Sequence, residues 1–275
     1  MKKTYLIAIA VCLAQTLNAQ ITDSVQTDSA KVKAGKNSGV LIEAGPVKVS
    51  VGGNDSTKRD KKIVKYPNLT FGLTFEHFDI GLSKYHTGSD FGAPAAYEYL
   101  ETDTWKTSNV GFDVLQLGLR FSPNIKVMLA AGLDWNHMRL KQNVTIAAEK
   151  PTLQPEQPQD PVNYSKNRFS SRYIRVPLYF EYRSPQNKKG NRTSIVFGPE
   201  VGFLIDGKVK QISKENGKEK FRDDYNFAPF RYGANIRVGY GGAGLFFKYY
   251  LSDVFAKNQG PTDYKNLSFG LTFGF

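Results

Sequence analysis

The amino-acid sequence predicts an all-β chain that folds as an eight-stranded antiparallel up-and-down transmembrane β-barrel. Three observations predict this fold: eight segments alternate apolar and polar residues, short and long connections alternate along the chain, and the polar face of the segments is rich in charge. In a membrane barrel, residues that face lipid alternate with residues that face the interior, so their hydropathies average out. The mean hydropathy of −0.40 is therefore compatible with a protein that crosses a membrane.

The N-terminus has the pattern of a signal peptide, which we assign to residues 1–19. Two lysines precede an apolar stretch that ends at Leu17, and Ala19 supplies the small residue before a cleavage site. The stretch is too short to cross a bilayer as a helix. The single cysteine, Cys12, lies within it, so the predicted mature chain has no thiol for disulfides, metal binding or catalysis.

Residues 20–65 are predicted to be a mostly flexible periplasmic segment that precedes a barrel of residues 66–275. The segment is rich in Ser, Thr, Asp, Lys and Gly, and it contains a run of charged residues at 58–62. Such a composition buries too little apolar surface to form a core. Within it, the apolar residues of 40–42 and 47–51 are compatible with one short hairpin around Gly45-Pro46.

The eight predicted strands are runs in which every second residue is apolar. Most runs are about nine to eleven residues long, the length of a tilted strand that crosses a bilayer. Residues Phe78 to Tyr85, which follow the first run, break its alternation, so we expect a bulge in the first strand there. The runs lie at residues 69–75, 115–121, 125–135, 174–182, 195–205, 232–240, 245–251 and 267–275.

The connections between these runs alternate in length. The short ones are residues 122–124, 185–191 and 241–242, and the long polar ones are residues 85–107, 143–168, 211–227 and 253–264. Short turns on one side and long loops on the other are typical of outer-membrane barrels. An even number of strands places both termini on the short-turn side, which we expect to be periplasmic.

Aromatic residues are predicted to mark the two membrane interfaces, because Tyr and Trp concentrate at headgroup depth. One group falls at the short-turn ends and the other toward the long-loop ends of the strands. These groups are Phe121, Tyr182, Tyr240 and Phe275, and Trp135, Phe203, Tyr232 and Tyr249.

The polar face carries acidic and basic residues together, and we expect it to line the interior of the barrel. Eight strands enclose a lumen that side chains can fill, so these residues are predicted to form a structural ion network with no catalytic role. They are Glu76, Arg120, Asp134, Arg175, Glu181, Arg183, Glu200, Arg231 and Arg237.

The formal net charge of +12 indicates an anionic partner. An exported protein rarely meets nucleic acid, so outer-membrane lipid and lipopolysaccharide fit the compartment better. One loop is especially basic and leaves two interpretations open: its lysines contact lipopolysaccharide phosphates, or they protect a hairpin tip at Asn216-Gly217 from edge pairing. These lysines are Lys208, Lys210, Lys214, Lys218 and Lys220.

The chain from about residue 66 to its end resembles the PorT-like outer-membrane β-barrel family. The resemblance rests on the closing alternation up to Phe275 and on a set of short motifs. It implies an eight-stranded barrel in the outer membrane of a Gram-negative bacterium, and one member type is linked to protein secretion across that membrane. The motifs are Ile174-Arg175-Val176-Pro177-Leu178, Pro229-Phe230-Arg231-Tyr232-Gly233, Arg237-Val238-Gly239-Tyr240-Gly241, Tyr249-Tyr250-Leu251-Ser252 and Phe269-Gly270-Leu271.

No catalytic or metal-binding motif is present in the sequence, and no cofactor is expected. The three histidines have no metal-ligand spacing. His137 is predicted to face outward near the outer rim, as the histidine of a lipid-modifying barrel enzyme would, but no serine partner is near it in the sequence. The proline-rich loop at residues 150–161 is read as an extended spacer, with a partner-binding surface as the alternative.

We therefore expect a monomeric, non-enzymatic scaffold or interaction protein of the envelope, which includes the accessory role in secretion that the resemblance implies. An envelope protein is a further expected partner. A small porin-like conduit is the alternative, and an enzyme that modifies lipid A is the third interpretation.

Overall fold

The computed structural model describes residues 31–34, 40–44, 47–51, 66–156 and 162–275. The predicted signal peptide and most of the predicted flexible segment lie outside the described residues, as do Pro158 and Pro161. Side chains are described from residue 66 onward, except those of residues 74–76. Among the described residues, no helix combines the length and the apolar character that crossing a bilayer requires.

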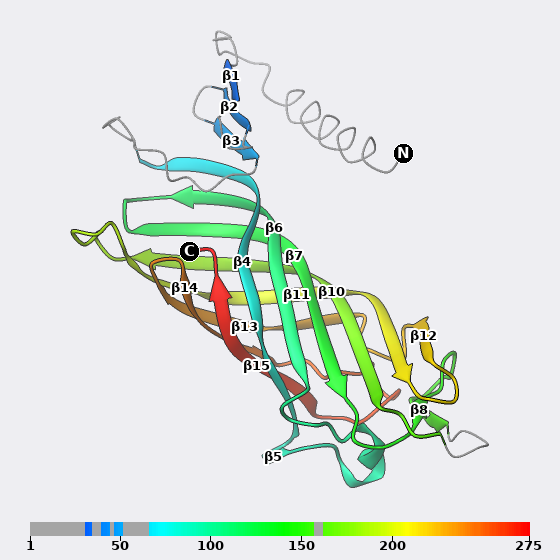
Figure 1. Ribbon diagram of the computed structural model, residues 1–275. Helices are drawn as coiled ribbons and strands as arrows, with labels where there is room; N and C mark the ends of the chain where they lie inside the picture. Colours follow the sequence, from blue (N-terminus) through cyan, green and yellow to red (C-terminus); the bar gives the residue numbers. More distant parts are fainter. Residues whose placement is uncertain (1–30, 35–39, 45–46, 52–65, 157–161) are drawn as a thin grey trace.

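Eight strands form a closed antiparallel ring, which confirms the predicted fold (Figure 1). Each strand pairs with the next one along the chain, and β15 pairs with β4 to close the ring. Closure satisfies the backbone of every strand, as a sheet in hydrocarbon requires. The strands are β4 (Asn68–Thr87), β6 (Ser108–Arg120), β7 (Ile125–Arg139), β10 (Lys166–Arg183), β11 (Thr193–Ile212), β13 (Phe230–Tyr240), β14 (Ala243–Tyr250) and β15 (Tyr264–Phe273).

The smaller elements lie at the two ends of the ring. At the short-turn end, β2 (Val40–Ala44) and β3 (Val47–Val51) form the hairpin that the sequence predicted, with β1 (Lys31–Ala34) beside β2. At the long-loop end, β11 continues into a hairpin with β12. The remaining elements at that end are β5 (Asp90–Phe91), the 3₁₀ helix η1 (Ala95–Leu100), β8 (Thr145–Ile146) and β9 (Pro155–Glu156), besides β12 (Lys218–Asp223).

Several strands are longer than the predicted nine to eleven residues, with β4 and β11 reaching 20 residues and β10 reaching 18. At about 3.3 Å per residue, such strands exceed what a bilayer core needs. Their extra length projects at the long-loop end, where β12 lies (Figure 1). The predicted long loop at 211–227 is therefore largely a β-ribbon.

The first strand contains the expected bulge, but it begins before Phe78. The pairing of β4 with β6 shifts register between Leu73 and Glu76 and again between Glu76 and Asp79. His77, inside this region, has a φ of 50°. The shifts change which residues point inward, because a one-residue slip moves every following side chain to the opposite face.

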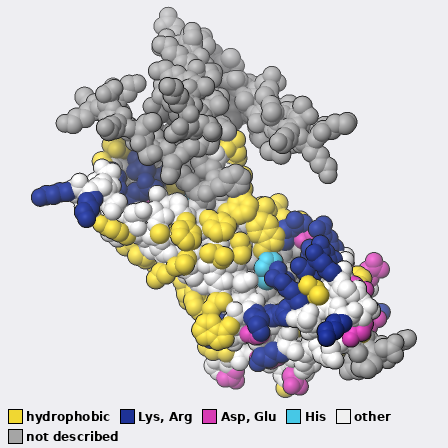
Figure 2. Space-filling view, viewed as in Figure 1, with side chains coloured by type: hydrophobic (Ala, Val, Ile, Leu, Met, Phe, Trp, Pro, Cys, Tyr) yellow, Lys and Arg dark blue, Asp and Glu magenta, His cyan; other side chains and the backbone are white. Residues whose placement is uncertain are grey.

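The apolar faces of the strands point out of the barrel and the charged faces point in. Leu117, Leu129 and Phe180 are 41%, 47% and 40% exposed, whereas Arg175 and Arg237 are fully buried. Hydrophobic side chains form a band across the visible surface (Figure 2). This arrangement is the reverse of a soluble protein and is the one expected for a barrel surrounded by lipid.

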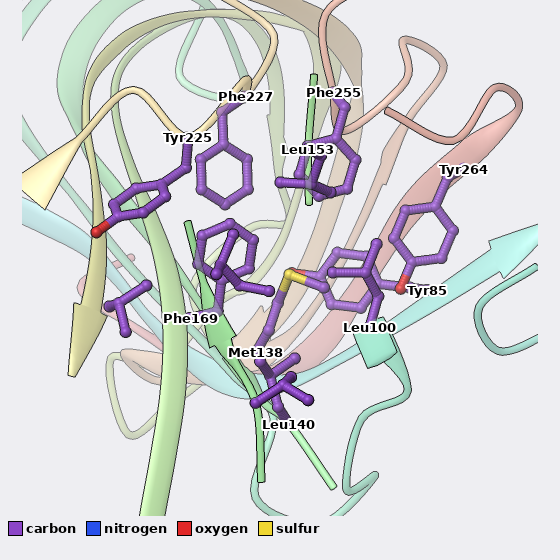
Figure 3. Close-up of a cluster of buried hydrophobic side chains, with 13 residues drawn as sticks. Tyr85, Leu100, Met138, Leu140, Leu153, Phe169, Tyr225, Phe227, Phe255 and Tyr264 are labelled. Atoms are coloured by element: carbon purple, nitrogen blue, oxygen red, sulfur yellow. The ribbon is translucent and has the colours of Figure 1, made fainter. Parts of the chain in front are cut away.

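A hydrophobic core closes the long-loop end of the barrel (Figure 3). All four long loops contribute to it, together with inward-facing residues of the strands. We call this core the loop cap; its buried members are Tyr85, Leu100, Met138, Leu140, Val144, Ile146, Leu153, Phe169, Val209, Tyr225, Phe227, Phe255 and Tyr264. The expectation of long polar loops was therefore incomplete, because the same loops carry apolar residues that pack over the lumen.

The proline-rich loop contributes to the loop cap instead of forming a free spacer over its described part. Leu153 is 4% exposed, and its backbone N–H donates to Gln259 at 2.6 Å. Pro155 lies in β9, which pairs with β8. The spacer interpretation is wrong for residues 150–156, because a buried leucine and a strand pair anchor them.

The C-terminal residue, Phe275, turns into the barrel and not toward lipid as predicted. Gly274 has a φ of 91°, which redirects the chain after β15. The Phe275 ring then packs on a small buried cluster that includes Met128 and Tyr179. Its aromatic ring closes the short-turn end from inside, so it belongs to the interior and not to the interfacial belt.

Candidate functional site

The interior of the barrel holds a compact network of eight charged side chains. All are at most 5% exposed, and they divide into four carboxylates and four cations, so their formal charges cancel. We call this set the lumen network. It comprises Asp79, Asp113, Asp134, Glu200, Arg175, Arg231, Arg237 and Lys248.

Asp79 is the first centre of the lumen network. Arg237 binds it with two hydrogen bonds, from Nε at 3.0 Å and from Nη2 at 2.8 Å. Arg175 Nη1 lies 2.8 Å and Lys248 Nζ lies 2.9 Å from its Oδ2. One carboxylate therefore joins cations from three strands, β10, β13 and β14, to β4.

Asp134 is the second centre, on the opposite side of Lys248. Lys248 Nζ lies 3.0 Å from Asp134 Oδ1, and Arg231 binds the other oxygen at 2.5 Å. Asn109 donates to both carboxylate oxygens, at 3.0 and 3.1 Å. Charge-assisted hydrogen bonds of this kind are the stronger ones in proteins.

Buried tyrosines complete the network. The Arg231 guanidinium lies between the rings of Tyr173 and Tyr250, 3.8 and 4.0 Å from their centroids. Tyr250 in turn donates to Glu200, and Tyr179 donates to Asp113 at 3.2 Å. Cation–π contacts strengthen when both partners are desolvated. Arginine and tyrosine side chains therefore occupy much of the polar interior.

Most of the predicted lumen residues lie in this interior, but not all of them meet. Asp134, Arg175, Glu200, Arg231 and Arg237 are brought together in the lumen network. A separate group, Glu181, Arg183 and Arg120, lies toward the short-turn end: Arg183 donates to Glu181, and Arg120 donates to the Pro123 carbonyl at 3.3 Å. The side chain of Glu76 lies outside the described part of the structure.

Sequence reasoning missed three members of the lumen network. Asp79 and Asp113 were missed because the bulges in β4 and β6 shift the alternation at these positions. The sequence did contain a signal for Lys248. It follows the lipid-facing Phe247 on β14, so the alternation of that strand points its side chain inward. Extending the alternation of that strand to its polar face would have found it.

The predicted lysines lie at the outward side of the long-loop end, together with other cations. Lys208 and Lys210 are on β11, Lys218 and Lys220 are on β12, and Lys214 is in the exposed turn between them. Gly217 in that turn has a φ of 67°, as a tight hairpin requires. Lys and Arg gather at this end beyond the hydrophobic band (Figure 2).

His137 has the serine neighbour that sequence spacing did not reveal. It pairs with Ser170 across β7 and β10, and its Nδ1 lies 3.0 Å from Ser170 Oγ. Residues 33 apart in sequence are thus in contact because two long strands align. Among the described residues, no carboxylate hydrogen bond or ion pair to His137 is present, so the pair has no third member to orient the imidazole.

No cluster of metal-ligating side chains is present among the described residues. The loop cap encloses three buried tyrosines, Tyr85, Tyr225 and Tyr264, and burial raises the pKa of the Tyr225 hydroxyl to about 12. The interactions that hold the lumen network together are ion pairs and hydrogen bonds.

The ring, the outward hydrophobic band and the filled polar interior together define a membrane-spanning β-barrel. A family model described as an outer membrane protein beta-barrel domain matches residues 47–255, more than half of the chain. The chain belongs to this family, and it is an integral outer-membrane β-barrel protein. No curated protein matches it significantly, and no solved structure does.

Proposed function

We propose that the protein is a non-conducting, non-enzymatic scaffold or interaction protein of the outer membrane, with its folded loops outside the cell and both termini in the periplasm. The observation that carries this proposal is the closure of the lumen. The lumen network fills the centre of the barrel, and the loop cap covers its long-loop end. The surfaces that remain for function are the outer rim, the loops and the segment before the barrel.

Planar-bilayer recording tests the alternative of a porin-like conduit. Because arginine, lysine and tyrosine side chains occupy the lumen, we expect no steady openings from the purified protein. Asp79→Ala with Phe227→Ala, which weakens both the lumen network and the loop cap, is expected to produce flickering currents. Steady, ion-sized openings of the unmodified protein would favour the conduit.

The contact between His137 and Ser170 makes a lipid-modifying enzyme the second candidate. A serine next to a histidine is the minimum of a nucleophile and its base, and both face outward near the membrane interface. The absence of an orienting carboxylate among the described residues supports the non-enzymatic proposal. We expect His137→Ala and Ser170→Ala to leave the lipid A of intact cells unchanged in mass; a change would support the enzyme.

The resemblance to PorT-like barrels supports an accessory role in protein secretion as the finer form of the proposal. Its motifs fall mainly on β10, β13, β14 and β15 and include three members of the lumen network, Arg175, Arg231 and Arg237. We expect deletion of the gene to reduce the export of a subset of proteins to the medium. Crosslinking in the native envelope followed by purification of the barrel identifies the partner, and unchanged export with no partner would argue against this role.

A further inference from the structure

The outward face of the barrel carries a second feature that the closed lumen does not explain. At the long-loop end, β7, β10, β11 and β12 present cations toward the outside in adjacent positions. We call this surface the basic rim. It consists of Arg139, Lys166, Arg168, Lys208, Lys210, Lys218, Lys220 and Arg222.

The register of the four strands aligns these cations in rows. Arg168 on β10 is opposite Arg139 on β7 and Lys210 on β11, and Lys210 is opposite Lys220 on β12. One cross-strand row therefore contains four cations and no carboxylate. Like charges directly opposite one another destabilise a sheet, so an anion bound across this row would relieve the repulsion.

The neighbouring row, two residues nearer the middle of the barrel, lines a shallow hollow in the surface. In it, Ser170 is opposite His137 and Lys208, and Lys208 is opposite Arg222. A shallow pocket of about 70 Å³ is lined here by Trp135, Ser170, Arg172, Lys208 and Arg222, together with one carboxylate, Asp206.

Few acidic side chains offset the basic rim. Asp206 binds Arg172 with two hydrogen bonds, at 3.0 and 2.7 Å, and lies 4.0 Å from Arg222. Within the described residues, no carboxylate lies within ion-pair distance of the other members of the basic rim. Consistent with this uncompensated charge, the Arg168 guanidinium lowers the pKa of Lys166, at the start of β10 beyond the apolar band.

The hydrophobic band lies directly below the basic rim on the same strands. Leu133, Ile174 and Phe203 form one cross-strand row of that band. From Ile174 to Arg168 is six residues, or about 20 Å along the strand. Trp135, opposite Arg172, lies between the two surfaces. A lipid with acyl chains on the band would therefore place its headgroup at the basic rim.

We propose that the basic rim binds the phosphate groups of lipopolysaccharide, with Lys210, Lys220 and Arg168 as the principal contacts and the hollow beside Lys208 and Arg222 as the site of one phosphate. The proposal rests on the proposed orientation, with the long loops outside, because lipopolysaccharide occupies the outer leaflet. Two or more clustered cations beside an acyl-facing surface suit a phosphorylated lipid better than a free anion.

The test uses the full protein reconstituted in nanodiscs and follows the fluorescence of Trp135. The chain has two tryptophans, so Trp105→Phe leaves Trp135, at the edge of the hollow, as the reporter. The titrants are bisphosphorylated lipid A, monophosphorylated lipid A, phosphatidylglycerol and inorganic phosphate. We expect bisphosphorylated lipid A to bind about fivefold more tightly than monophosphorylated lipid A, and more tightly still than the other two titrants, since each added ion pair near a membrane surface contributes roughly a factor of five.

Lys210→Gln with Lys220→Gln is expected to weaken the binding of bisphosphorylated lipid A by about tenfold or more. Lys210→Arg with Lys220→Arg, which keeps both charges, is expected to bind normally. Lys188→Gln with Lys189→Gln, two exposed lysines in the short connection between β10 and β11, makes the same change in net charge at the opposite end and should have no effect.

The proposal would be overturned if the variant with Lys210→Gln and Lys220→Gln bound bisphosphorylated lipid A as tightly as the unmodified protein does. It would also be overturned if the unmodified protein bound phosphatidylglycerol or inorganic phosphate as tightly as bisphosphorylated lipid A. A second measurement distinguishes a failure of the proposed binding site from a failure of the proposed orientation, in which the long loops lie outside the cell. It is the labelling of Lys214→Cys in intact cells with a membrane-impermeant maleimide. Labelling without lipid A binding rejects the basic rim site alone. Absence of labelling rejects the proposed orientation.

Discussion

At the scale of single residues, buried charge is tolerated in this barrel because two carboxylates, Asp79 and Asp134, each meet several cations. Asp79 contacts Arg175, Arg237 and Lys248, and none of the four side chains is more than 1% exposed. Removing one member of a buried ion pair leaves its partners without compensation, which costs about 3–5 kcal/mol. The lumen network therefore depends most on its shared carboxylates.

We expect Asp79→Asn to lower the stability of the barrel by about 3 kcal/mol or more. Three cations would lose a charged partner, whereas the size of the side chain stays the same. The measurement is urea unfolding in detergent, read from the heat-dependent shift in gel mobility. Asp103→Asn, in an exposed loop where Lys106 lowers the pKa of the carboxyl, is the control and should unfold like the unmodified protein.

Phe275 and two glycines determine how the short-turn end closes. Gly239 and Gly244 are paired across β13 and β14, and a Cβ at Gly239 would lie 2.3 Å from the Phe275 ring. The ring thus occupies the space that the missing side chains leave. This contact explains why two inward positions in neighbouring strands carry glycine.

A double-mutant cycle tests this contact. Gly239→Ala is expected to destabilise the barrel because the new methyl group displaces the ring, and Phe275→Ala because it leaves a cavity, by about 2–4 kcal/mol. In the double variant the methyl group has room. The loss in free energy of unfolding should therefore be clearly smaller for the double variant than the sum of the losses for the two single variants. Additive costs in urea unfolding would show that the two positions do not interact.

At the scale of the elements, the long connections behave as one folded unit. Phe227 stacks on Phe169 at a centroid distance of 4.7 Å and on Phe255 at 5.2 Å. These rings come from β10 and from two different loops. The loop cap therefore ties loops to the barrel wall through aromatic packing, which is strong relative to its area.

Phe227→Ala is expected to destabilise the loop cap by about 3 kcal/mol while the strands below stay paired. We predict faster proteolysis of the long loops without loss of the heat-dependent gel shift of the barrel. Phe221→Ala is the matched control, since that ring on β12 is 45% exposed. Simultaneous loss of loops and barrel would mean that the two fold as a single cooperative unit.

At the scale of the whole molecule, two sets of charges are expected to respond differently to salt. The lumen network is buried and neutral in sum, whereas the basic rim is open to solvent and carries one sign of charge. Screening acts on exposed charges far more than on buried ones. The same ionic strength should therefore leave the fold intact and weaken its surface contacts.

We predict that raising the salt from about 0.1 M to 1 M leaves the urea midpoint of the barrel nearly unchanged and weakens the binding of lipid A severalfold. Both are measured on the same reconstituted sample, by gel shift and by Trp135 fluorescence. A large fall in the urea midpoint would indicate that water and ions reach the lumen network.

Much of the fold and part of the candidate site could be predicted from the alternation alone. Period two along a strand is a local property, so it identified Arg175, Glu200, Arg231 and Arg237 as inward-facing. It failed for Asp79 and Asp113 because a bulge reverses the alternation, and the position of a bulge is decided by the pairing between strands.

The sequence by itself determined the class of the protein, the number of strands, their sidedness and the presence of a charged interior, because these follow from the pattern within each segment. Only the tertiary structure decided which charges meet, that the loops close the lumen, that Phe275 turns inward and that His137 lies beside Ser170. These features depend on the register between strands that are distant in sequence, and register is set by the closure of the whole ring.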